Sequence, residues 1–349
     1  MKTNIIEAID LFCGIGGLTY GLRHAGINVL AGLDNDESCQ YAYETNNSCK
    51  FVSADIAKYN FSEMKDLYSK DSIKVLVGCA PCQPFSSHTY KVKRKICDLR
   101  WDLIKHFVRA IQELKPHIIS MENVRGLTKT DVFKEFINDV KSLGYEIDYQ
   151  VVYAPDYGIP QNRSRLVLIG SRIGLINIPE ATHKKDKYTS VSDVIGKLPP
   201  IEAGEISEED PVHRAKNLSD LNQERIRQSI PNGTWRDWDP QILPNCYKKE
   251  SGQTYTSVYG RMSWNSISPT ITTQFYNYGS GRFGHPEQNR GLSLREGALL
   301  QTFPKDYDFG EEISLSKIGR HIGNAVPPRL GTVIGEAIIR HVEKRNGTK

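Results

Sequence analysis

Short apolar runs alternate with segments of helical spacing along the first half of the chain. The apolar runs are rich in β-branched residues and predict strands at residues 4–12, 27–33, 50–53, 73–77, 117–121, 145–153 and 166–170. The segments between them carry apolar residues three and four positions apart and predict helices at residues 18–25, 37–46, 99–114 and 132–143. This alternation is typical of an α/β fold, in which helices cover an open sheet.

The regular pattern ends near Arg172. Prolines interrupt the following segment repeatedly, and aromatic and basic residues interleave from Trp235 to Trp264. A helical pattern returns at Leu294, and a last helix is predicted at residues 333–342. We therefore expect residues 1–171 and 291–349 to build one regular domain and residues 172–290 to form a smaller, irregular one.

Composition and charge narrow the class of protein. The chain of 349 residues is long enough for one large core and a smaller domain, and it has no apolar run that could span a bilayer. Glu7 and Asp10 interrupt the first apolar stretch, which argues against a signal peptide. The seven scattered cysteines are typical of free thiols in a reducing cytoplasm. A net charge of +4 permits a polyanionic partner without requiring one.

Residues suited to a nucleotide-like cofactor follow the first three strands. Gly14, Gly16 and Gly17 form a turn in which a ligand can approach the backbone, although a tight structural turn is the alternative. Asp34 ends the second strand, where a carboxylate can accept hydrogen bonds from ribose hydroxyls. Asp55 follows the third strand and could accept from an adenine amino group. Either aspartate could instead cap the next helix.

The stretch GCAPCQPFS, residues 78–86, carries the clearest chemical signal. Cys82 follows a buried strand in a loop flanked by prolines, and ligands of open α/β sheets bind at such strand ends. This setting favours a reactive thiol over an inert buried one. Cys79 and Cys82 form a CxxC pair, but a structural zinc site would need further ligands at suitable spacing, and a redox dithiol is the weaker alternative.

Other candidate residues lie downstream. Glu122 follows a predicted strand, although taken alone it could be an ordinary surface glutamate. Arg163 and Arg165 would share one face of an extended segment, facing either a ligand oxygen or solvent. The long basic loop that includes Arg94 could contact phosphates, and Arg261 lies among the interleaved aromatic and basic residues.

A set of motifs taken together identifies a family. DLFCGIGG, GCAPCQPFS, ENV, QNRSR and GNAVPP occur in this order. The chain resembles the DNA (cytosine-5)-methyltransferases, in particular the compact single-chain bacterial and phage type, over about residues 5–172 and 261–342. The resemblance implies a Rossmann-like domain that uses S-adenosylmethionine, with residues 172–290 as a target-recognition domain.

The resemblance also implies how the chemistry is divided. The thiolate of Cys82 would add to carbon 6 of a flipped-out cytosine and so make carbon 5 nucleophilic. Glu122 would hydrogen-bond or protonate ring nitrogen 3. Arg165, with Arg163 nearby, would bind the exocyclic oxygen and stabilise the developing charge. No side chain dedicated to removing the carbon 5 proton is evident, so water would take it.

S-adenosylmethionine is the implied methyl donor, and no metal is expected. Its binding residues would be Phe12, Gly14, Gly16, Gly17, Asp34, Asp55, Pro81, Leu103, Asn324 and Val326. The implied DNA contacts are Gln83, Ser86, Arg94 and Arg261.

The implied substrate is a short specific site in double-stranded DNA, methylated by a cytoplasmic monomer with no membrane attachment. A cognate restriction endonuclease would be a separate chain. One alternative is transfer RNA methylation, but RNA-directed relatives continue the Pro-Cys-Gln core with threonine and arginine, where this chain has Ser86 and Ser87. A nicotinamide oxidoreductase would leave Cys82 without a role, and the intact Cys82 and Glu122 argue against a non-catalytic DNA-binding regulator.

Overall fold

The structure is a computed structural model that describes residues 5–81, 95–310 and 313–347. The predicted site residues Cys82, Gln83, Ser86 and Arg94 lie outside the described residues. The chain divides into two compact units. The first unit comprises Met1–Tyr157, Ser164–Thr182 and Ala325–Lys349, and the second comprises Gly158–Arg163 and His183–Asn324.

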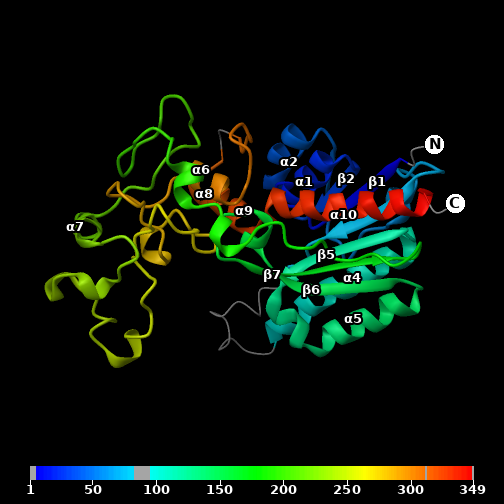
Figure 1. Cartoon of the computed structure of the whole chain (residues 1–349), viewed down its shortest axis with the longest axis horizontal. Helices are drawn as coiled ribbons and strands as arrows, with labels where there is room; N and C mark the ends of the chain where they lie inside the picture. Colours follow the sequence, from blue (N-terminus) through cyan, green and yellow to red (C-terminus); the bar gives the residue numbers. More distant parts are fainter. Residues whose placement is uncertain (1–4, 82–94, 311–312, 348–349) are drawn as a thin grey trace. The chain divides into compact units, whose positions relative to one another are not determined.

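A mixed sheet forms the centre of the first unit (Figure 1). Its strands are β1 (Ile6–Leu11), β2 (Asn28–Asp34), β3 (Lys50–Ser53), β4 (Ile73–Gly78), β5 (Ile118–Val124), β6 (Glu146–Tyr153) and β7 (Ser164–Ser171). They lie in the order β3-β2-β1-β4-β5-β7-β6. Neighbours from β3 to β5 pair in parallel, whereas β7 runs antiparallel to both β5 and β6. The predicted α/β sheet is confirmed, and β7 alone among the described strands runs against the others.

Helices cover both faces of this sheet. The helices of the unit are α1 (Gly17–Ala25), α2 (Gln40–Asn47), α3 (Ser62–Lys65), α4 (Lys95–Leu114), α5 (Asp131–Ser142) and α10 (Pro328–Gly347), with the 3-10 helices η1 (Glu37–Cys39), η3 (Arg125–Lys129) and η4 (Ala154–Tyr157). Figure 1 shows α1, α2 and α10 on one face and α4 and α5 on the other. Strand β4 is accordingly buried from Val75 to Gly78, which explains its continuous apolar run.

The last helix of the chain returns to the first one. A Cβ atom at Gly21 of α1 would lie 2.1 Å from the carbonyl oxygen of Pro328 and 2.5 Å from the amide nitrogen of Thr332. Only glycine permits two helix backbones to approach this closely. The C-terminal segment therefore completes the first unit, and on the opposite face Phe107 and Phe136 pack in the main core below the sheet.

The second unit consists of short helices joined by irregular segments. Its helices are α6 (Val191–Ile195), α7 (Asp220–Gln228), α8 (Leu294–Leu300) and α9 (Leu315–Asn324), with the 3-10 helices η5 (Lys185–Lys187), η6 (Trp235–Asp237), η7 (Pro240–Ile242), η8 (Glu250–Gly252) and η9 (Tyr278–Ser280). An aromatic cluster holds the loops together: Trp235 stacks on Tyr247 with 4.7 Å between ring centroids, and Trp238 and Tyr278 pack with them. Many of the aromatic residues of this region are therefore buried in its hydrophobic core.

The second unit extends beyond residue 290, where the sequence predicts its end. Helices α8 and α9 belong to it, and the return to the first unit begins at Ala325. The physical reason is a buried ion pair: both terminal nitrogens of Arg290 contact the carboxylate of Glu296 in α8, at 2.7 and 2.8 Å. Arg290 also donates to the carbonyl of Ile201, so α8 is anchored to the irregular region. None of the helices in the described part of the chain has the length and apolar character needed to cross a bilayer.

Candidate active site

The sheet has a topological switch point between β1 and β4. From β1 the chain proceeds outward to β2 and β3, whereas β4 is followed by β5 on the other side. Ligands of open α/β sheets bind at the carboxyl ends of the strands that flank such a point. Leu11 and Gly78 pair at these two ends. The predicted cofactor turn and the segment leading to Cys82 therefore begin on neighbouring strands.

The turn after β1 has an unusual backbone. Gly16 has φ 86°, and a Cβ atom there would lie 2.3 Å from Nδ2 of Asn47, so the position requires glycine. Phe12 has φ 61°, which a bulky side chain rarely adopts and which costs on the order of 1–3 kcal/mol. Such strain is concentrated at functional sites. The Phe12 ring packs against the main core, as does Leu103 of α4.

Asp34 ties the end of β2 to this turn. Its Oδ2 atom accepts the amide N–H of Gly14 at 2.9 Å, and its Oδ1 atom accepts the amide N–H of Asp36 at 3.0 Å. Burial raises the pKa of the Asp34 carboxyl, while these amide hydrogen bonds act in the opposite direction. Asp55 is exposed, and its Oδ1 atom accepts the amide N–H of Ala57 in a turn. The next helix, α3, begins only at Ser62, so Asp55 does not form the helix cap that was the alternative.

The turn has the features that S-adenosylmethionine would require. A Cβ atom at Gly14 would meet nothing within 4 Å, so the backbone there is open to a ligand. Helix α1 begins without a side-chain cap, which leaves its first amide groups able to bind a carboxylate. Two other predicted contacts belong to the first unit: Val326, which is buried, and Pro81, which is exposed. Asn324 is an exposed residue at the end of α9 in the second unit.

Glu122 is held from two sides at the end of the next strand. Contrary to the sequence prediction it lies within β5, and its side chain is 3% exposed. The thiol of Cys79 donates to Oε2 at 2.9 Å, and Nε of Arg165 lies 3.2 Å from Oε1. The Arg165 contact has the distance of an ion pair but not the direction of a hydrogen bond, so Oε1 makes no hydrogen bond within the described residues.

The neighbouring asparagine reinforces this arrangement. Nδ2 of Asn123 donates to the carbonyl oxygen of Ala80 at 3.0 Å. Cys79 and Ala80 directly precede the Pro81-Cys82 step. The Glu-Asn pair of the ENV motif thus anchors the chain immediately before the predicted nucleophile. The contact between Cys79 and Glu122 was not predicted. Cys79 directly follows β4, and this position next to the end of β5 is what could have indicated the contact.

Arg163 and Arg165 do not act as the matched pair that the sequence predicted. Strand β7 begins at Ser164, so Arg163 precedes the extended segment on which the shared face depends. Arg163 is buried in the second unit and donates to the carbonyl of Ile271. Arg165, in contrast, belongs to the first unit and contacts Glu122. The contact with the predicted acid is therefore made by Arg165.

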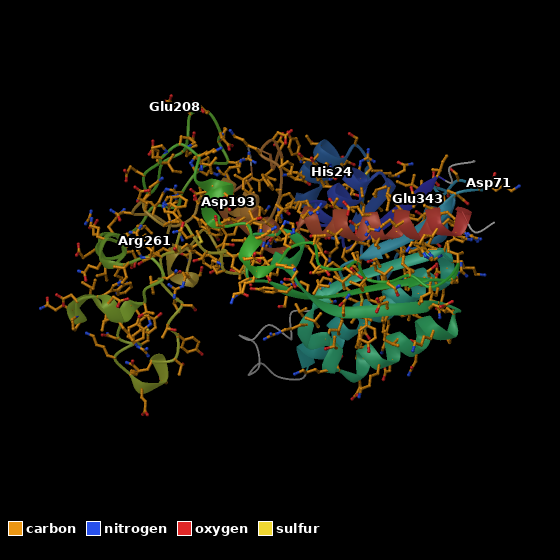
Figure 2. All side chains as sticks on the ribbon, in the orientation of Figure 1. His24, Asp71, Asp193, Glu208, Arg261 and Glu343 are labelled. Atoms are coloured by element: carbon orange, nitrogen blue, oxygen red, sulfur yellow. The ribbon has the colours of Figure 1, made fainter. Side chains whose placement is uncertain are left out.

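Arg261 corrects a second prediction, that of a DNA contact. Its side chain is 4% exposed and lies among the loops of the second unit (Figure 2). All five of its N–H donors bind protein acceptors, namely the carbonyls of Ile226, Ser229, His285 and Gln288 and the side-chain oxygen of Asn289. Arg261 therefore holds these loops together and has no donor left for DNA.

A buried carboxyl that was not predicted from the sequence lies beneath the glycine turn. Asp10 of β1 is 1% exposed and accepts a 2.7 Å hydrogen bond from the hydroxyl of Thr19, which also lies 3.2 Å from the hydroxyl of Tyr43. Burial raises the pKa of Asp10 to about 7. Thr19 occupies the position at which the GxGxxG fingerprint of dinucleotide-binding proteins has its third glycine. Its hydrogen bond to Asp10 explains why a threonine stands at this position. The presence of an aspartate inside an apolar strand could have indicated this buried network from the sequence.

Comparison with known proteins agrees with this geometry. The family model for C-5 cytosine-specific DNA methylase matches residues 6–340, so the chain belongs to that family. It is 50% identical over 340 residues to the Type II methylase M.HgiDII of Herpetosiphon aurantiacus, covering 96% of this chain and 95% of the relative. It is 33% identical to the Type II methyltransferase M.PspPI of a Psychrobacter species, covering 95% and 78%.

Solved structures share the fold. A DNA modification methyltransferase encoded in an E. coli prophage superposes with a TM-score of 0.69 at 24% identity, covering 97% of this chain and 99% of the other. The S. pombe Dnmt2 methyltransferase superposes with a TM-score of 0.66 at 17% identity, covering 98% and 99%. The protein is a DNA cytosine-5 methyltransferase of the restriction-modification type, and S-adenosylmethionine is the methyl donor of its family. The transfer RNA, oxidoreductase and regulator alternatives are not favoured.

Proposed function

We propose that Cys82, Glu122 and Arg165 perform the methylation of a flipped-out cytosine in a short, specific site of duplex DNA. The observation that carries this assignment is the position of Glu122. Its carboxylate lies between the side chains of Arg165 and Cys79, and Cys79 is three residues before Cys82 in the chain. Glu122 belongs to β5, which is the neighbour of β4, the strand that leads to Cys82. A buried acid tethered so close to a predicted nucleophile is suited to contact the base that the nucleophile attacks.

Each residue has a separate chemical task. The Cys82 thiolate forms a bond to carbon 6, and the electrons of the 5,6 double bond become available at carbon 5. Glu122 donates a proton or hydrogen bond to nitrogen 3, for which the Oε1 atom is suited because it makes no other hydrogen bond in the described structure. Arg165 stabilises the negative charge on the exocyclic oxygen. Once carbon 5 has gained the methyl group, water removes the carbon 5 proton, and the carbon–sulfur bond then breaks to restore the ring and the thiolate.

The glycine turn and the acids after β2 and β3 would hold the methyl donor. S-adenosylmethionine, when bound, supplies an electrophilic methyl group. Gly14, Gly16 and Gly17 would form the cradle for its methionine end, and the first amides of α1 would bind its carboxylate. Asp34 would hold the ribose and Asp55 the adenine amino group. The remaining proposed contacts are Phe12, Pro81, Leu103, Asn324 and Val326. The strain at Phe12 and the open backbone at Gly14 support this use of the turn.

Residues 172–290, which belong to the second unit from His183 onward, are proposed as the target-recognition domain. Gln83, Ser86 and Arg94 would contact DNA beside the nucleophile. Cytosine within a duplex is stacked and paired, so the enzyme must extrude it before Cys82 can reach carbon 6. We propose further that the protein acts as a monomer in the cytoplasm and protects DNA from a cognate restriction endonuclease on a separate chain.

The test measures transfer of labelled methyl groups to duplex DNA and to transfer RNA. We expect label on DNA at one sequence, mapped by bisulfite sequencing, and none on transfer RNA. Cys82→Ser should abolish transfer while binding S-adenosylmethionine with unchanged affinity. A duplex carrying 5-fluorocytosine in the site should trap a covalent adduct with the wild-type protein and not with Cys82→Ser, because fluorine cannot leave as a proton does. Near-normal turnover by Cys82→Ser would overturn the assignment.

A further inference from the structure

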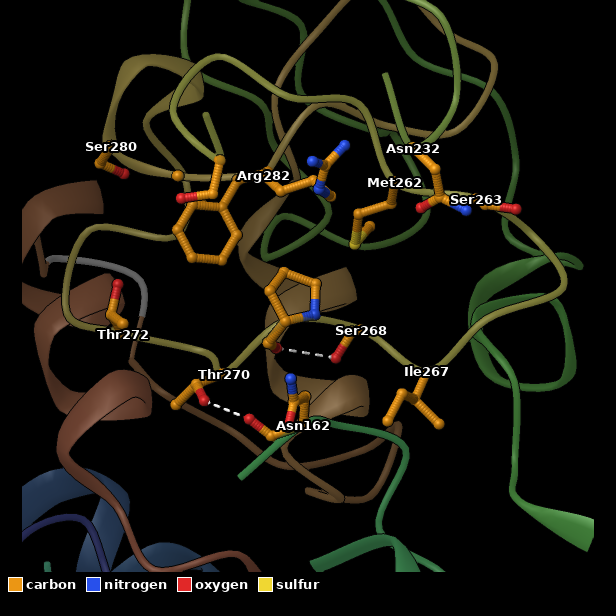
Figure 3. Close-up of a pocket in the computed structure, with 14 residues that line it drawn as sticks. Asn162, Asn232, Met262, Ser263, Ile267, Ser268, Thr270, Thr272, Ser280 and Arg282 are labelled. Carbon is orange, nitrogen blue, oxygen red and sulfur yellow. Dashed lines mark hydrogen bonds between the residues drawn. The ribbon is translucent and has the colours of Figure 1, made fainter. Parts of the chain in front are cut away.

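A polar cavity opens among the loops of the second unit (Figure 3). Its volume is about 410 Å³, which is enough for the edges of one or two bases. Its lining is mostly neutral and polar and includes Asn232, Ser263 and Thr272, with Met262 and Phe283 as apolar members. Such a mixture of amide, hydroxyl and apolar groups matches the donors, acceptors and methyl groups that base pairs display in the major groove.

Arg282 is the one charged residue among the described lining residues. It is half-buried, and burial lowers the pKa of its guanidinium below the ordinary value. Nη1 donates to the carbonyl oxygen of Gly233 at 2.6 Å. A Cβ atom at Gly260 would lie 3.0 Å from Cγ of Arg282 and 3.1 Å from Nη1, so the side chain lies directly against that backbone. The guanidinium is thus fixed by one donor and by packing.

The remaining donors of Arg282 make no hydrogen bond to the described residues, and Figure 3 shows the side chain beside Asn232 and Met262 at the cavity. In Arg261, in contrast, every N–H donor binds a protein oxygen. We propose that Arg282 is a specificity-determining residue that reads a guanine of the target site through its O6 and N7 atoms, with Asn232 and Ser263 beside it in the cavity. This inference rests on the proposed function.

A base edge suits this site better than a phosphate. Phosphate contacts position a protein on DNA without reading its sequence, whereas a half-buried cation among neutral polar groups offers the mixed donors and acceptors that match a base edge. A partly immobilised guanidinium fork is suited to the two acceptors of guanine, because less conformational freedom is lost when it binds. The duplex around any target cytosine contains at least one guanine, so such a partner is always present.

The experiment replaces each guanine of the mapped site in turn by 7-deazaguanine, which lacks the N7 acceptor. For the wild-type enzyme we expect kcat/KM to fall about 10- to 100-fold at one guanine. Arg282→Gln should lower kcat/KM on the unmodified site by a similar factor and become insensitive to 7-deazaguanine at that position. Its affinity for S-adenosylmethionine and its thermal midpoint should stay near those of the wild type.

The matched control is Arg236→Gln. Arg236 is an exposed arginine of the same unit that lies over the Trp235 ring, donates to the carbonyl of Gln253 and does not line the cavity. This variant should keep the full sensitivity to 7-deazaguanine, and any loss should be equal on all sequences. If Arg282→Gln behaves in that same way, the proposal is wrong, and Arg282 is a phosphate contact or a structural residue.

Two further results test whether Arg282 reads a guanine even if Arg282→Gln does not fold. Wild-type turnover that tolerates 7-deazaguanine at every guanine would overturn the proposal without any variant. Arg282→Met, which keeps the aliphatic stem against Gly260, should lose the same discrimination as the glutamine variant, and retained discrimination would contradict the inference. A wild-type protein that methylates no DNA would contradict the proposed function itself, and this inference with it.

Discussion

Nε of Arg165 lies 3.2 Å from Oε1 of Glu122 across the antiparallel pair of β5 and β7. In this pair Arg165 stands opposite Val124, so Glu122 is its diagonal neighbour on the same face of the sheet. A long arginine side chain can span that diagonal, whereas a shorter residue could not. The register of two strands that pair only in the folded protein therefore brings the acid and the cation together.

Replacing Glu122 by glutamine should separate chemistry from binding. The glutamine side chain has nearly the same size as the glutamate but could not transfer a proton to nitrogen 3. We expect kcat to fall by about 10²- to 10⁴-fold, the usual contribution of a general acid, with little change in S-adenosylmethionine affinity. Single-turnover methylation and equilibrium binding measure the two effects. A variant with near-normal single-turnover rates would remove Glu122 from the mechanism.

Cys79 should tune the position of Glu122 without taking part in bond formation. Cys79→Ala removes the 2.9 Å hydrogen bond to Oε2, and we expect kcat to fall by about 3- to 10-fold, in line with one hydrogen bond. Formation of the 5-fluorocytosine adduct should persist, since Cys82 is intact. Cys246→Ala, at an exposed cysteine, is the control and should have no effect. Complete loss of the adduct in Cys79→Ala would contradict a purely positioning role.

Asp10 should make stability depend on pH. Its pKa is about 7 in the folded protein against an ordinary value of 3.8, so between these values the folded state holds a proton that the unfolded state has released. Stability should therefore decrease as pH rises from about 4 to about 7. At about 1.4 kcal/mol per pH unit, the full effect is on the order of 4 kcal/mol. Asp10→Asn should remove this slope in denaturation curves between about pH 4 and 7, and parallel curves for both proteins would refute the prediction.

The ion pair of Arg290 and Glu296 should stabilise the second unit. Glu296→Gln leaves a fully buried guanidinium without its counter-charge, which typically costs about 3–5 kcal/mol. Arg290 lowers the pKa of Glu296 to about 2, so this contribution is present above the unfolded value near 4.5 and is lost as pH falls toward 2.

Asp193→Asn is the matched control for this change. Asp193 occupies the same position in the capping box of α6 as Glu296 does in that of α8, but it is exposed (Figure 2). Chemical denaturation should therefore show a much smaller loss for Asp193→Asn. Equal losses in the two variants would assign the effect of Glu296→Gln to helix capping alone.

The sequence by itself determined the α/β class, the order of the strands along the chain, the family, and the positions of Cys82, Glu122 and the glycine turn. These features depend on local spacing: apolar runs predict strands, and the residues just past each strand are those that an open sheet places at its ligand-binding edge. The predicted end of β5, at residue 121, is three residues too early, because Glu122 to Val124 pair only with β7, which lies far along the chain.

Only the tertiary structure decided how distant residues combine. Arg163 and Arg165 are two positions apart, yet one is buried against Ile271 and the other contacts Glu122. Arg261 was predicted as a DNA contact among interleaved aromatic and basic residues, but five acceptors from residues 226–229 and 285–289 enclose it. Arg282, in contrast, keeps donors available at a cavity of the described structure. Burial and hydrogen-bond partners of this kind arise from contacts between segments that are remote in the chain, and local residue spacing carries no record of them.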